Sequence, residues 1–427
     1  MRAVAIDVCI IGLGYVGLPL AVEFAGAGLR TVGIDVNREK VDGVNRGVSH
    51  VPDVPEERLR GPVSQGLLGA TTDFSALREA DAVCICVPTP LTKTMDPDIS
   101  HIVASVEEVA RHLHPGMLVV LESTTYPGTT EELALPRLEA SGLKAGRDFH
   151  LAFSPERVDP GNRQYGTRNT PKVIGGLTPA CTERAAALYR HAVDTVVPVS
   201  TPAAAEMVKL LENTFRAINI GLANEAALMC ERLGVDVWEV IDAASTKPFG
   251  FMPFYPGPGL GGHCIPIDPL YLSWKMKTAN YTARFIELAT SINSAMPEHV
   301  ANRIGDALNL AGKSVRDSRI LILGAAYKPG VADIRESPAL DIMGLLSRKG
   351  AEIAYADPYV PELALPDRTL KAHPPEAGFG GFDCAAIITN HAGFDYARLV
   401  GEAPLVYDAR NALRGVKIPA SCRVVRL

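Results

Sequence analysis

Three glycines near the start of the chain constrain its fold more than any other feature. The segment "IGLGYVG" places Gly12, Gly14 and Gly17 in the spacing GxGxxG. An apolar run typical of a buried strand, "VAIDVCIIG", leads into them, and a helical pattern, "LPLAVEFAGAG", follows. The first glycine permits a tight turn, the second lets the backbone approach a pyrophosphate, and the third lets helix and strand pack closely. The segment therefore predicts a dinucleotide site that opens a Rossmann-like domain.

An acidic residue stands where such a site needs one. Asp35 ends the next predicted strand, "TVGID", at the position from which a carboxylate binds ribose hydroxyls. Because this carboxylate would repel a 2′-phosphate, Asp35 favours NAD over NADP. Arg38 lies three residues further on and could accept that phosphate, so it is a second candidate cofactor contact.

Short apolar runs alternate with helical patterns along both ends of the chain. "DAVCICV", "MLVVLEST", "FHLAFS" and "TVVPVS" continue the first set, and "RILILGAAYKPG", "AEIAYADP", "CAAIITNH" and "PLVYDARN" form a second, smaller set after Asp317. Apolar strands with helical crossovers are typical of doubly wound parallel sheets. We therefore predict an α/β protein with two Rossmann-like doubly wound domains.

One long helix is expected between the two α/β domains. "STPAAAEMVKLLENTFRAINIGLANEAALMCERLG" begins with Ser200 or Thr201 as a cap and ends at Gly234. Its residues are apolar on most sides, so we expect burial between domains. The predicted domains are 1–199 for the cofactor, 200–312 for a central helical region that includes the cysteine loop, and 313–427 for the second α/β fold.

Composition excludes several classes of function. The 427 residues carry a net charge of −6, which implies no basic surface for nucleic acid, and no apolar run is long enough to span a membrane. The eight cysteines are irregularly spaced and include no CxxC pair, so we expect neither a disulfide framework nor a metal site. A cytoplasmic protein in a reducing compartment is the natural expectation.

The long helix carries polar residues on one face. Lys209 and Asn213 are four residues apart, and Glu206 precedes them on the same face. A solvated stripe on a surface helix would explain this spacing equally well. The apolar neighbours favour burial instead, and a buried lysine needs an anionic partner or a developing negative charge. A sugar oxygen that becomes an alkoxide would serve.

A thiol lies in the glycine-rich segment "FYPGPGLGGHCIPIDP". Cys264 taken alone is most simply a small buried apolar residue. The surrounding glycines and prolines instead suggest an accessible, stiff loop that accepts a substrate, in which a thiolate could act as a nucleophile. His263 could be an activating base or a packing residue, and Asp268 is better suited to bind a water or a hydroxyl.

A dinucleotide site together with a nucleophilic thiol indicates oxidation at the aldehyde level. The chain also resembles the UDP-glucose/GDP-mannose dehydrogenase family along nearly its whole length. Seven motifs carry the resemblance in order: "IGLGYVGLP", "CVPTP", "ESTTYPGTTEE", "FSPERVDPGN", "VKLLENTFRAINIGLANE", "PGPGLGGHCIPIDP" and "GAAYKPGVADIRESPAL". Several most resemble the branch that acts on UDP-N-acetylglucosamine. The UDP-glucose and UDP-N-acetylmannosamine branches are the alternatives.

The resemblance implies a role for each matching residue. Cys264 would be the nucleophile, and Lys209 and Asn213 would hold the oxygen at C6. Asp268 would position the catalytic water or accept a proton. Glu156 would be the acid/base, and Thr124 would lie near the nicotinamide. The implied cofactor contacts, besides the three glycines and Arg38, are Tyr15, Val16, Asp35, Thr89, Thr124 and Arg335. The implied substrate contacts, besides Lys209 and Asn213, are Arg157, Val158, Arg216, Tyr255, Gly261, Lys328 and Arg410.

Two departures weaken a match to the UDP-glucose enzymes. Many of those enzymes have a lysine where this chain has Ile267, and often a serine where it has His263. The implied reaction oxidises the CH2OH at C6 of a UDP-sugar to a carboxylate with two NAD+, in a homodimer or larger assembly with the long helix at the interface. A two-electron hydroxyacid dehydrogenase and a non-catalytic nucleotide-sugar sensor are the rival hypotheses.

Overall fold

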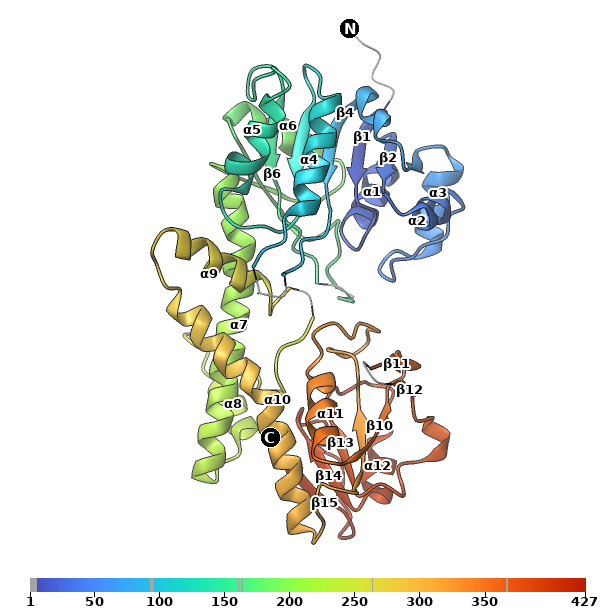
Figure 1. Cartoon of the computed structure of the whole chain (residues 1–427), viewed down its shortest axis with the longest axis vertical. Coiled ribbons are helices and arrows are strands. Elements are labelled where there is room, and N and C mark those ends of the chain that lie inside the picture. The colour runs from blue at the N-terminus through green and yellow to red at the C-terminus, as the bar shows by residue number, and fades with distance from the viewer. Residues whose placement is uncertain (1–5, 93–95, 160, 163, 263, 366–367) are drawn as a thin grey trace. The chain divides into compact units, whose positions relative to one another are not determined.

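The computed structural model describes residues 6–92, 96–159, 161–162, 164–262, 264–365 and 368–427. The chain forms two compact units (Figure 1). Residues 1–212 and 270–281 make up the first unit, and residues 213–269 and 282–427 make up the second. The long helix α7 (Pro202–Leu233) begins in the first unit and ends in the second.

The first unit contains an eight-stranded sheet in the order β3-β2-β1-β4-β5-β6-β7-β8. The order reverses between β1 and β4, as the predicted doubly wound fold requires. The strands are β1 (Ile6–Ile11), β2 (Thr31–Ile34), β3 (Leu68–Thr71), β4 (Ala80–Ile85), β5 (Leu118–Leu121), β6 (His150–Phe153), β7 (Lys172–Gly176) and β8 (Val196–Val199).

Helices cover both faces of this sheet because neighbouring residues of each strand point to opposite faces. One buried cluster joins Ile10 and Cys84 to α1 (Gly17–Gly26), α3 (Glu56–Ser64) and α6 (Pro179–Tyr189). The other joins Ile11 and Ile85 to α4 (Ser100–His112) and α5 (Leu135–Glu139). The remaining elements are α2 (Arg38–Asn45), η1 (Phe74–Glu79), η2 (Thr130–Ala134) and α9 (Asp268–Thr278).

One strand pair of the first sheet departs from the parallel arrangement. β6 pairs with β7 in the antiparallel sense, whereas the other pairs are parallel. The described residues between Phe153 and Lys172 contain no helix, so this connection lacks the crossover that parallel neighbours need. Sequence patterns predicted neither β7 nor β3, since both are short and contain glycine.

Helix α7 matches its predicted ends closely. The Thr201 hydroxyl accepts a hydrogen bond from the N–H of Ala204, and Gly234 ends the helix with a φ of +68°. The expected burial on most sides is wrong along one stripe, where five large apolar side chains are 46–76% exposed. These residues are Leu211, Phe215, Leu222, Met229 and Leu233.

The second unit contains a five-stranded parallel sheet in the order β10-β9-β13-β14-β15. Its strands are β9 (Arg319–Leu323), β10 (Glu352–Ala356), β13 (Cys384–Ile387), β14 (Leu405–Asp408) and β15 (Arg423–Arg426). Helices α10 (Arg284–Leu310) and α11 (Pro338–Arg348) pack on one face, and α12 (Tyr396–Glu402) packs on the other. Smaller elements are α8 (Val237–Ser245), η3 (Pro375–Ala377) and the hairpin β11 (Glu362–Ala364) and β12 (Thr369–Lys371).

Candidate active site

The glycine loop after β1 has the geometry that its sequence predicted. Gly12 has a φ of +92°, and a Cβ on it would lie 2.6 Å from the carbonyl oxygen of Cys86. A Cβ on Gly17 would lie 1.8 Å from the carbonyl oxygen of Gly12, so helix and turn meet only if this residue lacks a side chain. A Cβ on Gly14 would have no heavy atom within 4 Å. The loop therefore leaves open space beside Gly14, at the start of α1, where a pyrophosphate can meet helix N–H groups.

Asp35 lies directly after β2 and is fixed by two backbone groups. Its carboxylate accepts hydrogen bonds from the N–H of Leu13 at 2.9 Å and of Asn37 at 2.9 Å. A cavity of about 500 Å³ next to it is lined by Gly14, Tyr15 and the basic residues Lys40 and Arg46, among others. Lys40 Nζ lies 3.8 Å from the Asp35 carboxylate. The sequence analysis did not predict Lys40 or Arg46 as cofactor contacts. Arg38, the basic residue that it did predict, is the first residue of α2.

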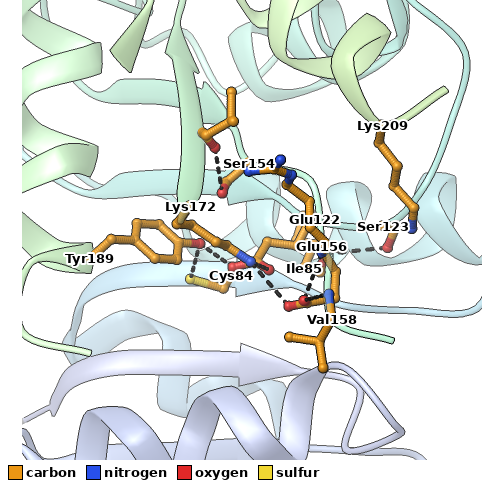
Figure 2. Close-up of polar contacts among 12 residues, drawn as sticks. Cys84, Ile85, Glu122, Ser123, Ser154, Glu156, Val158, Lys172, Tyr189 and Lys209 are labelled. Atoms are coloured by element: carbon orange, nitrogen blue, oxygen red, sulfur yellow. Dashed lines mark hydrogen bonds and ion pairs between the residues drawn. The ribbon is translucent and has the colours of Figure 1, made fainter. Parts of the chain in front are cut away.

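The buried acid at Glu156 belongs to a charged cluster. Lys172, the first residue of β7, lies with its Nζ 2.7 Å from the carboxylate of Glu122 and 3.2 Å from that of Glu156 (Figure 2). The Glu156 carboxylate also accepts hydrogen bonds at 2.7 Å from the N–H groups of Arg157 and Val158. Burial raises the pKa of Glu156, but the attraction of Lys172 and the N–H of Val158 outweigh it and hold this pKa below its usual value.

The side chains of the polar face of α7 are buried, which excludes a solvated stripe. Lys209 Nζ donates to the hydroxyl of Thr124, in the segment after β5. Glu206 accepts hydrogen bonds from the N–H of Gly128 and from the N–H and hydroxyl of Thr130. Burial raises the pKa of Glu206. Glu206 therefore anchors the loop that carries Thr124 to the helix that carries Lys209, within the first unit.

In the second unit, Asn213 and Asp268 are joined directly. The side-chain amide of Asn213 donates to the Asp268 carboxylate at 2.6 Å, and both side chains are buried. Asp268 begins α9, and its N–H donates to the carbonyl oxygen of Cys264 at 2.8 Å. Cys264 is exposed, whereas Cys84 and Cys86 are buried as predicted. The thiol therefore lies at an accessible turn, one helical turn from a fixed carboxylate. His263 lies outside the described residues.

The glycines before Cys264 are required by close packing within the second unit. A Cβ on Gly261 or Gly262 would lie 2.6 or 2.8 Å from the Tyr327 side chain. A Cβ on Gly257 would lie 2.5 Å from the guanidinium of Arg410. The N–H of Gly257 donates to the side-chain oxygen of Asn224 on α7. The loop is therefore held from both α7 and the loops of the smaller sheet.

The basic residues that the sequence analysis suggested for substrate contacts have different surroundings. Arg157 pairs with Glu212 at 2.6 Å, whereas Arg216 is exposed on α7. Arg335, which the resemblance implied as a cofactor contact, pairs with Asp333 at 2.6 Å. Arg410 donates to the carbonyl oxygen of Ile388 at 3.0 Å, and burial lowers its pKa to about 10. Because burial disfavours the charged form of Arg410, an anion such as a pyrophosphate beside it would stabilise that charge.

The other suggested contacts are placed as follows. Tyr255 stacks on Trp238 with ring centroids 5.7 Å apart, and its hydroxyl donates to Asp242 at 2.8 Å. Lys328 is partly buried in the loop after β9, and Thr89 is buried after β4. Val16 immediately precedes α1. Within the described ranges, no cluster of three or more His, Cys, Asp or Glu side chains could hold a metal ion, and no helix is long and apolar enough to cross a membrane.

Family models match three consecutive parts of the chain. The NAD-binding domain of the UDP-glucose/GDP-mannose dehydrogenase family matches residues 6–193, the central domain matches 203–295, and the UDP-binding domain matches 321–415. The chain belongs to this family. It is an NAD-dependent nucleotide-sugar dehydrogenase, and the open loop beside Gly14 and the cavity near Asp35 fit the NAD that the family binds.

Relatives within the dehydrogenase family resemble the whole chain. A UDP-N-acetyl-D-mannosamine dehydrogenase of Pyrococcus horikoshii is 39% identical over 83% of this chain and 84% of its own length. An NDP-N-acetyl-D-galactosaminuronic acid dehydrogenase of Ralstonia nicotianae is 35% identical over 98% of this chain and 100% of its own. The solved structure of the UDP-D-ManNAc dehydrogenase of P. horikoshii superposes with a TM-score of 0.89 at 35% identity, covering 98% of both chains.

Two glycines of the NAD-binding loop should respond oppositely to the same substitution. Gly14→Ala places a methyl group in the open space beside α1, so we expect an unchanged melting temperature and a raised dissociation constant for NAD+. Gly17→Ala forces the turn and helix apart, so we expect a clearly lowered melting temperature. Thermal unfolding and calorimetric titration measure both effects. Equal NAD+ affinity in Gly14→Ala and the parent chain would contradict the assignment of this loop.

Proposed function

We propose that this dehydrogenase oxidises the C6 hydroxymethyl group of a UDP-N-acetylhexosamine to a carboxylate through a covalent intermediate on Cys264. The observation that carries the proposal is the exposed thiol of Cys264 at the turn that leads into Asp268, whose buried carboxylate holds Asn213. A two-electron oxidation needs no nucleophile and no such turn. A four-electron oxidation needs both a thiol and a group that positions water.

The first oxidation needs a base for the hydroxyl proton. NAD+, which the glycine loop after β1 and Asp35 would hold, would supply the hydride acceptor for each of the two oxidations. Glu156, whose pKa is held low, remains ionised and is the proposed acceptor of the hydroxyl proton. Lys209 and Asn213, one helical turn apart on α7, are proposed to donate hydrogen bonds to the oxygen at C6 as it gains negative charge. The product of this stage is an aldehyde.

In the second oxidation, Cys264 is proposed to bind the substrate covalently. Its sulfur adds to the aldehyde carbon, and the thiol proton is transferred, in sum, to the carbonyl oxygen, which becomes the hydroxyl of a thiohemiacetal. Loss of a hydride from carbon and a proton from that hydroxyl gives a thioester. Water, positioned by Asp268, then adds to the thioester and releases the carboxylate and the Cys264 thiol. The sum is one CH2OH, two NAD+ and one water converted to one carboxylate, two NADH and three protons.

The proposed sugar is an N-acetylated hexosamine carried by UDP. The motifs "ESTTYPGTTEE" and "FSPERVDPGN" resemble the branch that acts on UDP-N-acetylglucosamine, and Ile267 stands where many UDP-glucose enzymes have a lysine. The names of the relatives reported above, which act on N-acetylmannosamine and N-acetylgalactosaminuronic acid derivatives, support an acetamido group at C2. We propose UDP-N-acetylglucosamine first, with UDP-N-acetylmannosamine as the alternative and UDP-glucose as a poorer substrate.

The choice of sugar is tested by side-by-side kinetics. We expect kcat/KM for UDP-N-acetylglucosamine to exceed that for UDP-glucose, because a site built for an acetamido group loses its hydrogen bonds when a hydroxyl replaces it. UDP-N-acetylmannosamine, assayed in the same series, decides between the two epimers. A higher kcat/KM for UDP-glucose than for both acetamido sugars would overturn the proposal.

The role of the thiol is tested by Cys264→Ser. We expect this nearly isosteric variant to bind NAD+ and UDP-sugar normally and to fail at or after the second oxidation, because an alcohol is a poor nucleophile without its own base. Overall turnover should fall by several orders of magnitude, at about 1.4 kcal/mol of barrier per factor of ten. Lys209→Ala, in contrast, should slow both oxidations.

Single-turnover formation of NADH separates these two variants, because only Lys209→Ala should slow the first phase. Cys422→Ser is the control, since Cys422 is a buried thiol directly before β15 and belongs to a core cluster of the second unit. Release of two NADH per sugar by Cys264→Ser at the parent rate would exclude the covalent mechanism.

We further propose that the chain acts as a homodimer through the exposed stripe on α7. At 100° per residue, Leu211, Phe215, Leu222, Met229 and Leu233 lie within about 40° of one another around the helix. An exposed apolar stripe of this length marks an interface with another protein surface, and its seven-residue spacings suit a second helix. A cytoplasmic location of this chain is likewise proposed, since its cysteines are irregularly spaced and include no CxxC pair.

Charged substitutions in the exposed stripe test the proposed dimer interface. Leu222→Glu combined with Met229→Glu should convert the assembly to a monomer, because paired carboxylates would be buried at the interface. Leu310→Glu, an exposed leucine at the end of α10, is the control and should leave the mass unchanged. Sedimentation equilibrium gives the mass of each variant, and a parent chain that is monomeric at micromolar concentration would refute the proposal.

A further inference from the structure

The strongest unexplained feature is the buried lysine of β7. Lys172 is 4% exposed, and Glu122 is fully buried beside it. A buried charge is costly unless it is paired, and a pair of this kind is often no more stabilising than apolar residues of the same volume. Stability alone therefore gives no strong reason to place an ammonium group here.

The position of the ammonium group relates it to the acid/base residue. In Figure 2, the Lys172 side chain reaches between Glu122 and Glu156, and the Tyr189 hydroxyl lies beside Glu122. The distances from Lys172 Nζ are 2.7 Å to the Glu122 carboxylate and 3.2 Å to Oε2 of Glu156. The other oxygen of Glu156, Oε1, is held by the N–H groups of Arg157 and Val158. Lys172 thus fixes both the orientation and the charge of Glu156.

The other titratable groups around the ammonium group are few. Burial raises the pKa values of the Cys84 and Cys86 thiols and of the Tyr189 hydroxyl, so these three groups stay neutral. Lys209 on α7 also contributes attraction at Glu156, after that of Lys172. The charge at this place is therefore set by two lysines and two carboxylates.

The two carboxylates differ in how readily they take up a proton. Burial and the repulsion from Glu156 raise the pKa of Glu122, although Lys172 opposes this. The pKa of Glu156 is lowered despite its burial, with Lys172 the largest favourable cause. On acidification Glu122 therefore takes up a proton first, and Glu156 stays ionised to lower pH.

We propose that Lys172 is a positioning residue that acts through Glu156, keeping this carboxylate ionised and correctly oriented to accept the proton of the substrate hydroxyl. The inference rests on the proposed role of Glu156 in the oxidation. Glu122 holds the ammonium group in place from the other side, and the Tyr189 hydroxyl donates a hydrogen bond to Glu122.

The test is the pH dependence of kcat/KM in Lys172→Gln. Without the cation, the pKa of Glu156 rises, so Glu156 is protonated, and activity is lost, at higher pH than in the parent chain. We expect the acid limb of the profile to move up by about 1 to 3 pH units, the usual effect of an opposite charge at this distance. At alkaline pH the variant should regain activity as Glu156 ionises but stay below the parent rate, because Glu156 has lost one of the contacts that orient it. The dissociation constant for NAD+ should not change. Lys172→Arg should return the acid limb towards its original position.

Glu122→Gln is the matched control within the same buried cluster. Because Glu122 is already protonated where Glu156 titrates, a neutral amide should leave the acid limb in place. If Glu122→Gln moved the acid limb as far as Lys172→Gln, general disruption of the cluster would explain both results and the proposal would be wrong. Should Lys172→Gln fail to fold, the double variant Glu122→Gln/Lys172→Met removes both charges and should show the same upward shift.

Glu156→Gln separates this inference from the proposed function. If Glu156→Gln loses activity and Lys172→Gln leaves the acid limb unmoved, Lys172 does not act through Glu156. If Glu156→Gln keeps full activity, the proposed base is wrong instead. Infrared difference spectra against Glu156→Gln then report the protonation of Glu156 directly, without any need for turnover. The spectra should show this carboxyl taking up its proton at higher pH in Lys172→Gln, and an unchanged titration would overturn the inference.

Discussion

The ion cluster of Lys172 with Glu122 and Glu156 depends on the strand order of the first unit, and it holds the proposed base, Glu156, in place. Three neighbouring strands supply it, because Lys172 opens β7 and the two glutamates follow β5 and β6. The segments after β5 and β6 also carry Thr124, which accepts from Lys209, and Arg157, which pairs with Glu212. Charges at the carboxyl ends of the central strands therefore connect the sheet to α7, at the edge where open α/β sheets place their ligands.

The second unit has its own set of contacts, and it includes the rest of helix α7. Within that unit Asn213 holds Asp268, and Asn224 holds the loop that ends at Cys264 through the N–H of Gly257. The glycines of the loop are explained by packing against Tyr327 and Arg410, so the loop is rigid for a physical reason that is separate from the reactivity of its thiol. A nucleophile on such a loop loses little conformational freedom when it reacts, which is the benefit of preorganisation in covalent catalysis.

The sequence predicted the features that depend on local patterns. The glycine spacing, Asp35 at the end of β2 and the cap and end of α7 follow from backbone geometry within a few residues, and the structure has each of them. Strands β3 and β7 were missed because four- and five-residue runs with glycine give little periodic signal. Lys172 was missed with β7, since a lysine that begins an unrecognised strand reads as a surface residue. The exposed stripe of α7 was misjudged because the apolar pattern of a helix does not show which of its apolar residues the chain itself covers. Which sugar is bound depends on a few side-chain contacts, and no sequence period reports those.

The central claim is that one chain removes four electrons from the C6 carbon of a nucleotide sugar, with the thiol holding the intermediate between the two oxidations. The most direct measurement is the number of NADH molecules formed per molecule of limiting UDP-N-acetylhexosamine, read by absorbance while mass spectrometry identifies the product. The account predicts two NADH and a 6-carboxylate, with no aldehyde accumulating in solution. One NADH per sugar, with the 6-aldehyde as the product, would contradict it.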